Sequence, residues 1–461
     1  MANYETAVAQ MYALGHELAQ TPSHKFDLAH MRVLLSALGH PENRFPTVLI
    51  AGTNGKGSTA ATLASILQAS GLKTGLYTSP HLVRINERIR LNGHSIADDD
   101  FAMLHDVVDR TAERLVTEGD LPWHPSFFEM LTAMGFEYFA RSRPDIVVLE
   151  VGMGGRLDAT NVVDPRLSII TDIALDHQKY LGETIAEIAR EKTGIIRPGG
   201  VVVTLPQLPE ANDVIGNAIL DAGARAVNAV PYVPPVSPKS DPWASGGEWQ
   251  RYPLDVMGKQ IQVQSPLVGR HQLRNLALAI AAAVELHGQQ IEDQIENPAI
   301  AQITPETVAQ GIRQTHWPGR FQVVPAAGDD PEYVLDVAHN PAGAWALRST
   351  LSAYQNAENP RQITMVFGVM RDKAVQEMTE ILFPIADHVI VTHANNPRSA
   401  SANEIRQAAA RVTAATDIEE AEDVTSALEK ARKRAGSQGL VVITGSIYVV
   451  GEAMRKLNIR I

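Results

Sequence analysis

Short runs of β-branched and other apolar residues alternate with longer segments of helical periodicity along most of this sequence. Such an alternation is typical of α/β folds, in which helices connect the strands of a parallel sheet. The expected strands of a first group are 47–51, 145–151, 167–171 and 200–204. Those of a second group are 332–337, 363–369, 388–393 and 439–446. Two separate groups of strands predict two sheets and therefore two domains.

The segment between the two groups, HWPGRFQVV, contains Pro318 and Gly319, which interrupt regular structure. We therefore place the domain boundary near residue 316, with an N-terminal domain at 1–315 and a smaller C-terminal domain at 316–461. A length of 461 residues suits two domains, each with its own core. Residues 230–252, rich in Pro, Ser and Gly, are expected to form an excursion on the surface.

Charge and composition narrow the functional classes. The formal net charge of −12 disfavours binding to nucleic acids or to anionic membranes. The absence of cysteine excludes disulfides, thiolate metal sites and a thiol nucleophile. The sequence shows neither a signal peptide nor an apolar run long enough to span a membrane. We expect a cytoplasmic protein.

A glycine-rich loop follows the first predicted strand in the segment TVLIAGTNGKGSTAATLASIL. Gly52, Gly55 and Gly57 allow the backbone to approach a phosphate closely, and Lys56 adds a positive charge where a helix begins. A hydroxyl just past the lysine, such as that of Ser58, is in position to reach a magnesium ion. The combination favours a phosphate-binding loop. The alternative is a tight strand-to-helix turn in which the glycines serve packing alone.

The loop departs from the G-x-x-x-x-G-K-[ST] pattern at two positions. Ile50 stands where the first glycine is expected, and Gly57 separates Lys56 from Ser58.

Polar residues follow the next predicted strands. Glu150 ends the strand of DIVVLEVGMGG, and His177 follows the strand of LSIITDIALDH, with Asp172 and Asp176 before it. Glu150 is a candidate magnesium ligand, or alternatively the partner of Arg156 in a salt bridge. For His177 alone a metal role is the weaker reading, because imidazole suits softer ions than magnesium.

Lys192 lies late in a predicted helix that ends at Gly194. From composition alone it is a solvated lysine, favourably placed at the negative end of the helix dipole.

Together these motifs resemble a known family, the ATP-dependent Mur ligases, and within it the branch of folylpolyglutamate and dihydrofolate synthases. The matching segments are GTNGKGS (52–58), TSPHLVRINERI (78–89), LEVGMGGRLDATN (149–161), DHQKYLGETIAEIAREKTGIIRPG (176–199), GRHQLRNLALAI (269–280), WPGRF (317–321) and LDVAHNPAG (335–343). They occur in the family's order and cover nearly the whole chain. The resemblance implies a P-loop ATPase-like N-terminal domain with helices on both faces of a parallel sheet. It also implies a Rossmann-like C-terminal domain that closes over ATP and binds glutamate.

The resemblance also implies roles for individual residues. The residues that match ATP-binding positions are Asn54, Gly55, Lys56, Gly57, Ser58, Asn275, Arg320 and Asp336. Those that match magnesium ligands are Ser79, Glu150 and His177. Lys56, Lys192 and His339 match residues of the catalytic site. Lys192 corresponds to a lysine that family members carry as a carbamate formed with carbon dioxide, and His339 to a histidine that faces the phosphates. Without the resemblance, His339 is a loop histidine that caps a turn before Pro341.

The implied reaction is the ATP-dependent addition of L-glutamate to dihydropteroate, to reduced folates, or to both, through an acyl phosphate. The expected cofactors are ATP and two magnesium ions, and relatives suggest a monomer. The alternatives are a monofunctional folylpolyglutamate synthase or another Mur-type amino-acid ligase. From other classes, a phosphotransferase and a non-catalytic nucleotide-binding module remain open.

The pterin substrate is expected in the N-terminal domain, with residues 21–31 and 124–136 as candidate walls. Phe127 and Phe128 offer stacking surfaces, and Asp27 and Glu129 offer hydrogen-bond acceptors. The core of an amphipathic helix explains these aromatic residues equally well.

Overall fold

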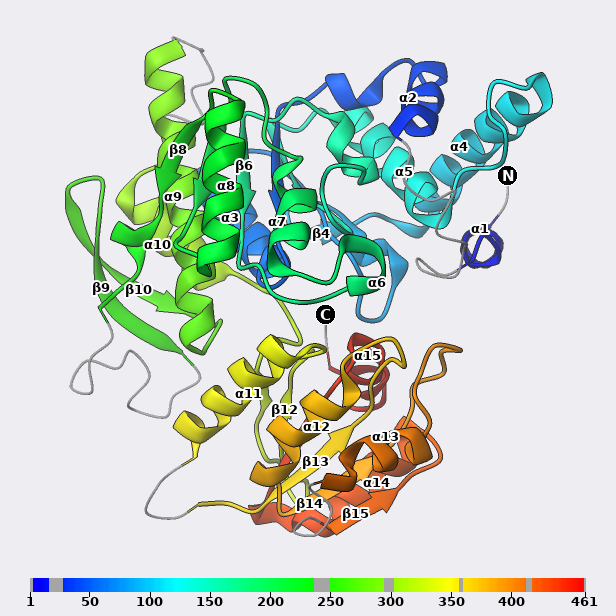
Figure 1. The fold of residues 1–461 in the computed structure, drawn as a ribbon, viewed down its shortest axis with the longest axis vertical. Helices are drawn as coiled ribbons and strands as arrows, with labels where there is room; N and C mark the ends of the chain where they lie inside the picture. The colour runs from blue at the N-terminus through cyan, green and yellow to red at the C-terminus, as the bar shows by residue number, and fades with distance from the viewer. Residues whose placement is uncertain are drawn as a thin grey trace.

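Two sheets, each covered by helices, make up the protein in the computed structural model (Figure 1). The structure describes residues 3–15, 28–235, 249–293, 302–355, 360–411 and 417–459. In Figure 1 the larger, N-terminal part lies above, and the C-terminal part presents α11 (Pro341–Tyr354) and α15 (Ile447–Lys456) toward it.

The N-terminal sheet has eight strands in the order β4-β3-β2-β5-β1-β6-β7-β8. Their bounds are β1 (Thr47–Ala51), β2 (Thr74–Tyr77), β3 (Ile89–Leu91), β4 (His94–Ser95), β5 (Ile146–Glu150), β6 (Leu167–Ile170), β7 (Val201–Thr204) and β8 (Arg225–Asn228). From β2 to β8 all neighbours pair in parallel, whereas β3 pairs antiparallel with both β2 and β4. Strand β1 thus lies between β5 and β6, which come about 100 residues later in the chain.

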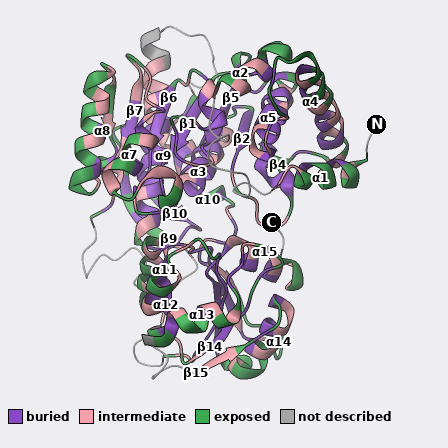
Figure 2. Cartoon of the chain, turned by 45° about the vertical axis from the view of Figure 1, so that its right-hand side comes forward, coloured by how far each residue is buried: buried purple, intermediate pink, exposed green. Residues whose placement is uncertain are grey.

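Helices cover both faces of this sheet. Strand β1 is therefore buried on both sides, as is typical of a central parallel strand. Val48 and Ile50 belong to a core that includes residues of α3 (Lys56–Ala69), α9 (Arg270–Asp293) and α10 (Pro305–Gln314). Leu49 and Ala51 point to the opposite core. The helices of that face are α1 (Tyr4–Ala13), α2 (Leu28–Ala37), α4 (Asp98–Glu118), α5 (Phe127–Ser142), α7 (Ile185–Thr193) and α8 (Pro209–Asp221). Figure 2 shows the buried strands between helices whose outer faces are exposed.

The C-terminal sheet has six strands in the order β11-β12-β16-β13-β14-β15. Their bounds are β11 (Gln322–Val324), β12 (Glu332–Leu335), β13 (Ile363–Phe367), β14 (His388–Val391), β15 (Asp417–Glu420) and β16 (Leu440–Thr444). Only β11 runs antiparallel, to β12. Helices α11, α12 (Val375–Leu382) and α13 (Ala402–Ala408) pack on one face, and α14 (Val424–Ala435) and α15 on the other.

The remaining described elements are smaller. A hairpin of β9 (Gln250–Val256) and β10 (Lys259–Ser265) forms a separate two-stranded sheet, whose apolar side chains pack into the same core as α10. The single-turn helix α6 (Gln178–Leu181) precedes α7. Among the described residues, no helix combines the length and the apolar character that crossing a bilayer requires.

The predicted α/β fold with two sheets is confirmed. All eight predicted strands are present, and no strand end differs from its predicted position by more than two residues. The expectation for residues 230–252 is wrong at its C-terminal end. Gln250 and Tyr252 belong to β9 and are buried, while residues 236–248 lie outside the described ranges. The predicted boundary at residue 316 lies in the connection between α10 and β11 and stays a prediction.

Candidate active site

A cavity of ≈ 680 Å³ opens where the loops of the two sheets meet. Its N-terminal wall is formed by the loops that follow β1, β5 and β6. Its C-terminal wall is formed, among others, by residues 336–339, 342–343, 346–347, 370, 373 and 446–448. Because β5, β1 and β6 are neighbours, their carboxyl ends lie side by side at one edge of the sheet. This arrangement brings together residues that are far apart in the sequence.

The glycine loop joins β1 to α3 and lines the cavity. Helix α3 begins at Lys56, and Gly55 precedes it in the left-handed conformation, with φ +88°. A Cβ atom at Gly55 would lie 2.1 Å from Oδ1 of Asn275. The loop is held by its backbone, since the N–H groups of Thr53 and Asn54 donate to the carbonyl oxygen of Asp172 at 2.9 and 3.1 Å. The glycines therefore do serve packing, and the loop also borders the cavity.

Two lysines converge on this loop. Nζ of Lys56 donates to the carbonyl oxygens of Gly52 at 3.2 Å and Thr53 at 3.3 Å. Nζ of Lys192 donates to the same Gly52 oxygen at 2.7 Å. Burial, together with the charge of Lys56, lowers the pKa of Lys192 to about 7. Lys192 is only 4% exposed, so its interpretation as a solvated helix-end lysine is wrong.

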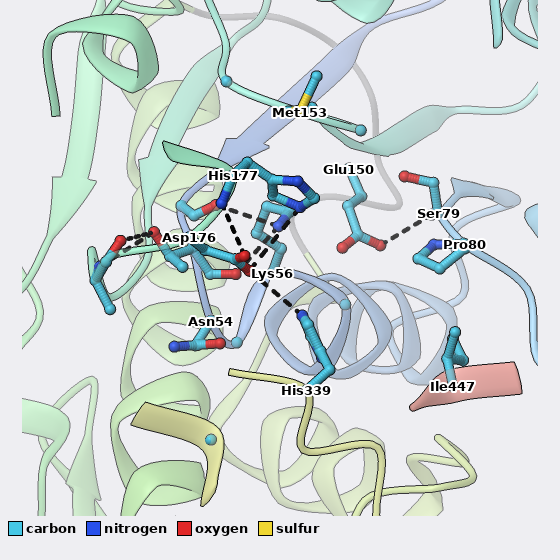
Figure 3. Close-up of a pocket in the computed structure, with 18 of the residues that line it drawn as sticks. Asn54, Lys56, Ser79, Pro80, Glu150, Met153, Asp176, His177, His339 and Ile447 are labelled. Carbon is cyan, nitrogen blue, oxygen red and sulfur yellow. Dashed lines mark hydrogen bonds and ion pairs between the residues drawn. The ribbon is translucent and has the colours of Figure 1, made fainter. Parts of the chain in front are cut away.

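Glu150 lies at the carboxyl end of β5 and lines the same cavity as Lys56. Burial raises the pKa of Glu150, and the charge of Lys56 opposes this shift. The backbone N–H of Ser79 donates to Oε2 of Glu150 at 3.2 Å, and Figure 3 shows the two side by side. The alternative partner, Arg156, binds Glu191 instead, with Nη2 2.9 Å from Oε1. The salt-bridge interpretation of Glu150 and Arg156 is therefore wrong.

A buried network around Asp176 connects the two walls. Its Oδ1 atom is 2.5 Å from Nζ of Lys373, and its Oδ2 atom accepts from Nδ2 of Asn340 at 3.1 Å. His339 Nε2 lies 3.5 Å from Oδ2 and His177 Nε2 lies 3.9 Å from it (Figure 3). Although burial alone would raise it, the hydrogen bond from His339 and the nearby positive charges hold the pKa of Asp176 well below its ordinary value. Burial lowers the pKa of His177 to about 3, so this ring is neutral at physiological pH.

The predicted residues of the C-terminal wall lie at the same cavity. Asp336 accepts hydrogen bonds from the backbone N–H groups of Phe321 at 2.8 Å and Ala338 at 2.9 Å. Burial raises the pKa of Asp336, while the nearby guanidinium of Arg320 opposes the shift. Nδ1 of His339 lies 2.9 Å from the carbonyl oxygen of Val337, in the turn before Pro341, as a turn-capping histidine would. The N-cap of the following helix is Asn340, whose side chain accepts from Gly343 N at 2.8 Å.

Magnesium requires oxygen donors and commonly binds through one or two carboxylates together with substrate phosphates and water. Within the ranges that the structure describes, no three His, Asp or Glu side chains form a group that could hold a metal ion by themselves. Ser79, Glu150 and His177 nevertheless line one cavity. Nδ1 of His177 is buried and has no hydrogen-bond partner. One carboxylate, one hydroxyl and a free imidazole nitrogen fit an ion whose remaining ligands come from a nucleotide and water.

The candidate pterin residues are only partly available. Phe127 and Phe128 line the cavity, but Phe127 is 3% exposed and stacks on Tyr12 at 5.8 Å between ring centroids. Oε2 of Glu129 already accepts from the backbone and hydroxyl of Ser126, in the capping box of α5. Asp27 lies outside the described residues.

The structure adds site residues that the sequence did not single out. Lys373 follows β13 and reaches Asp176, and no local motif marks it. Arg274 binds Asp172 with two nitrogens, Nε at 2.9 Å from Oδ2 and Nη2 at 2.6 Å from Oδ1. Asp158 is buried and accepts from the backbone N–H of Met153 at 2.9 Å. The only sequence signal for these residues is a polar side chain just beyond a strand or beside a known motif.

Comparison with known proteins matches this chain to two family models. Residues 50–283 match the Mur ligase middle domain, and residues 319–447 match the Mur ligase glutamate ligase domain. The dihydrofolate synthase/folylpolyglutamate synthase of Bacillus subtilis (strain 168) is 35% identical over 94% of this chain and 95% of its own length. The folylpolyglutamate synthase of Lacticaseibacillus casei is 36% identical over 82% of this chain and 83% of its own.

Solved structures show the same similarity over the whole chain. Mycobacterium tuberculosis folylpolyglutamate synthase, complexed with ADP and AMPPCP, superposes with a TM-score of 0.81 at 29% identity and covers 100% of both chains. Escherichia coli FolC, in complex with DHPP and ADP, superposes with a TM-score of 0.77 at 27% identity, covering 99% of this chain and 98% of its own.

Proposed function

Because this chain belongs to the Mur ligase family, we propose that it is an ATP-dependent amide ligase that joins L-glutamate to dihydropteroate and to reduced folates. Its relatives carry the names of both activities. The enzyme is a dihydrofolate synthase/folylpolyglutamate synthase that forms an acyl phosphate and releases ADP and phosphate.

The observation that carries this proposal is the meeting of two sets of charged residues at one cavity. Lys56, Glu150 and Lys192 come from the loops and helices of the first sheet. Arg320 and Asp336 come from the second part of the chain. A phosphotransferase or a passive nucleotide-binding module gives no reason for the second set.

The chemistry needs charge stabilisation rather than a strong nucleophile. A carboxylate of the pterin substrate attacks the γ-phosphorus of ATP, and the amine of glutamate then displaces phosphate from the acyl phosphate. Lys56 and Arg320 are placed to stabilise the negative charge that develops on the transferred phosphoryl group. Magnesium, held by Ser79, Glu150 and His177, would neutralise charge on the phosphates when bound. The two walls together would keep water from the acyl phosphate.

Lys192 is suited to the carbamate found in the family. Only a neutral amine attacks carbon dioxide, and a pKa near 7 leaves about half of Lys192 neutral at pH 7. The product is an anion beside Lys56, whose positive charge favours it. Within the described part of the chain, the buried ammonium makes a single hydrogen bond, to Gly52, so conversion to the carbamate also relieves the cost of a buried cation.

We assign the glutamate site to the C-terminal wall. Lys373 and Arg398 line the cavity there, and so does Ser446 at the start of α15. Both cations pair with aspartates here, Lys373 with Asp176 and Arg398 with Asp372, and a substrate dicarboxylate would share their charge. The pterin site is assigned to the opposite end, where Met31 and Phe128 supply apolar surface. ATP lies between them, over the glycine loop and Asn275.

The test is ADP release by the purified protein with Mg-ATP and glutamate, in parallel reactions with dihydropteroate, with a reduced folate, or with neither, and with products identified by mass. Turnover with both pterins supports the bifunctional enzyme. Turnover with the reduced folate alone identifies a monofunctional folylpolyglutamate synthase. Stimulation by neither pterin refutes the folate assignment and directs the search to other carboxylate substrates.

The proposal includes a cytoplasmic monomer. A chain without cysteine suits a reducing compartment, and one chain supplies both walls of the cavity. Light scattering during size-exclusion chromatography tests the oligomeric state, and cell fractionation tests the location.

A further inference from the structure

Trp317 lies against the glycine that interrupts the phosphate-loop pattern. A Cβ atom at Gly57 would lie 2.7 Å from Cζ2 of Trp317 and 3.1 Å from its Cε2 and Nε1 atoms. Gly57 lies in the first turn of α3 with helical geometry, where an alanine would favour the helix. The glycine is therefore required by the neighbouring indole and not by its own backbone conformation.

The indole also contacts a buried cation. Cζ of Arg90 lies 5.4 Å from the centroid of the Trp317 ring, a cation–π distance. Arg90 is buried and donates through Nε to the carbonyl oxygen of Glu87 at 3.0 Å. Nε1 of Trp317 is buried and has no hydrogen-bond partner. The ring thus packs against both a buried guanidinium and the start of α3.

The chain leading to Trp317 follows α3 along its length. Gly311 of α10 packs against the backbone of Ile66, where a Cβ atom would lie 2.4 Å from Cα, and accepts from Oγ of Ser65 at 2.7 Å. Six residues later Trp317 reaches the opposite end of α3, at Gly57. The connection is therefore attached to both ends of the helix that carries Lys56.

The same connection continues into the C-terminal wall. Gly319 accepts from the backbone N–H of Val337 at 3.0 Å, and the N–H of Phe321 donates to Asp336 at 2.8 Å. Arg320 lies between these two anchored residues, three positions after Trp317. A displacement of the indole would consequently move both the phosphate loop and Arg320.

We propose that Trp317 is a positioning residue for the nucleotide: its indole occupies the space beside Gly57 and thereby sets the phosphate loop and Arg320 at a fixed separation. Gly57, directly after Lys56, has no side chain, and this leaves the space that the indole of Trp317 fills. The inference rests on the proposed function for its effect on turnover, but its effect on nucleotide binding stands without it.

The test is a double-mutant cycle of Gly57→Ala and Trp317→Phe, because phenylalanine lacks the outer ring atoms that approach position 57. The two readouts are the Kd of a non-hydrolysable ATP analogue by calorimetry, and kcat and KM for ATP. Gly216→Ala is the matched control for the first change, since Gly216 is a helical glycine of α8 with no atom within 4 Å of its added Cβ. Trp345→Phe, at a tryptophan that is 56% exposed on α11, is the control for the second.

We expect Gly57→Ala to weaken analogue binding by about 10-fold or more, and the double variant to recover at least about 5-fold of that loss, because residues in contact are energetically coupled. Trp317→Phe alone should raise the KM for ATP and lower kcat, while its melting temperature stays near that of Trp345→Phe. Additive effects in the cycle would overturn the proposal. So would a Trp317→Phe variant that loses thermal stability but keeps the wild-type Kd, KM and kcat.

Analogue binding separates this inference from the proposed ligase activity. If the wild-type protein binds the analogue but joins glutamate to neither pterin, the proposed function fails and the cycle still decides the role of Trp317 through Kd. If a Gly57→Ala variant does not fold, the comparison of Trp317→Phe with Trp345→Phe decides it.

Discussion

The buried amine of Lys192 should make the stability of the protein depend on pH. Its pKa is about 7 in the folded state and near the ordinary 10.5 in the unfolded state, so between these values the unfolded chain binds more protons. Stability therefore rises with pH across this window. The difference between the two pKa values corresponds to a change of about 5 kcal/mol in the free energy of unfolding, at about 1.4 kcal/mol per pKa unit. About 2.5 kcal/mol of this change falls between pH 6 and pH 9.

The comparison protein is Lys192→Met, which keeps the helix propensity and most of the volume but cannot titrate. Urea unfolding of both proteins in buffers free of carbon dioxide gives the free energy of unfolding at each pH. The difference between wild type and variant should shift by about 2.5 kcal/mol in favour of the wild type from pH 6 to pH 9, since other titrating groups are common to both. A difference that stays constant within about 0.5 kcal/mol would refute the assigned burial cost.

Carbon dioxide extends this experiment to the carbamate. The lone pair of the neutral amine forms a bond to carbon and one proton is released, so the neutral amine becomes an anion; starting from the ammonium, two protons are released. With ¹³C-labelled bicarbonate near pH 8, a carbamate resonance should appear in the wild type and be absent from Lys192→Met, and turnover should rise with the resonance. A wild-type spectrum without the resonance, at full ligase activity, would show that the unmodified amine suffices.

Three further predictions concern the loop, the carboxylate and the contact between the walls. Glu150→Gln should lower kcat/KM by at least about 100-fold in an ADP-release assay, because it removes the only carboxylate of the assigned metal site. Its melting temperature should not fall, since burial already disfavours the charged form. Gly55→Ala should abolish measurable ATP-analogue binding by calorimetry, whereas Gly119→Ala should leave it intact; both glycines have positive φ, but only at position 55 would the Cβ collide with another residue. Lys373→Met should cost about 3 kcal/mol in urea unfolding, because it leaves Asp176 buried without its cation, and adding Asp176→Asn should restore part of that loss; equal losses in the single and double variants would contradict the ion-pair argument.

The sequence was sufficient for the parts of the fold that local chemistry determines. Strand β1 has its predicted bounds because a run of buried apolar residues ends at glycines and a lysine. Weakly apolar strands were missed. Strand β15 reads DIEE and β8 reads RAVN, and neither shows the hydrophobic pattern of a strand, because each lies at the edge of its sheet and is largely exposed.

Site residues divide in the same way. Lys56 was identified because it lies between two glycines after a clear strand, and Glu150 because it ends a clear strand just before a glycine-rich turn. Lys373 was not, since its partner Asp176 is 197 positions away and only the packing of the two parts brings them together. The interpretation of Lys192 as solvent-exposed was wrong for a related reason. The sequence shows that this lysine lies in the last turn of a helix, but not that the distant glycine loop packs over it.

The position of β1 between β5 and β6 has a consequence for how the protein is made. In the sheet, Ile50 pairs with Glu150 on one side and with Ile169 on the other, so the strand before the glycine loop lacks at least one flanking strand until about 120 more residues have been translated. At about 5–20 residues per second, this interval is about 6–24 s. During that time β1 has an unpaired apolar edge on at least one side, so the nascent N-terminal segment is exposed to aberrant strand pairing until β6 has been made.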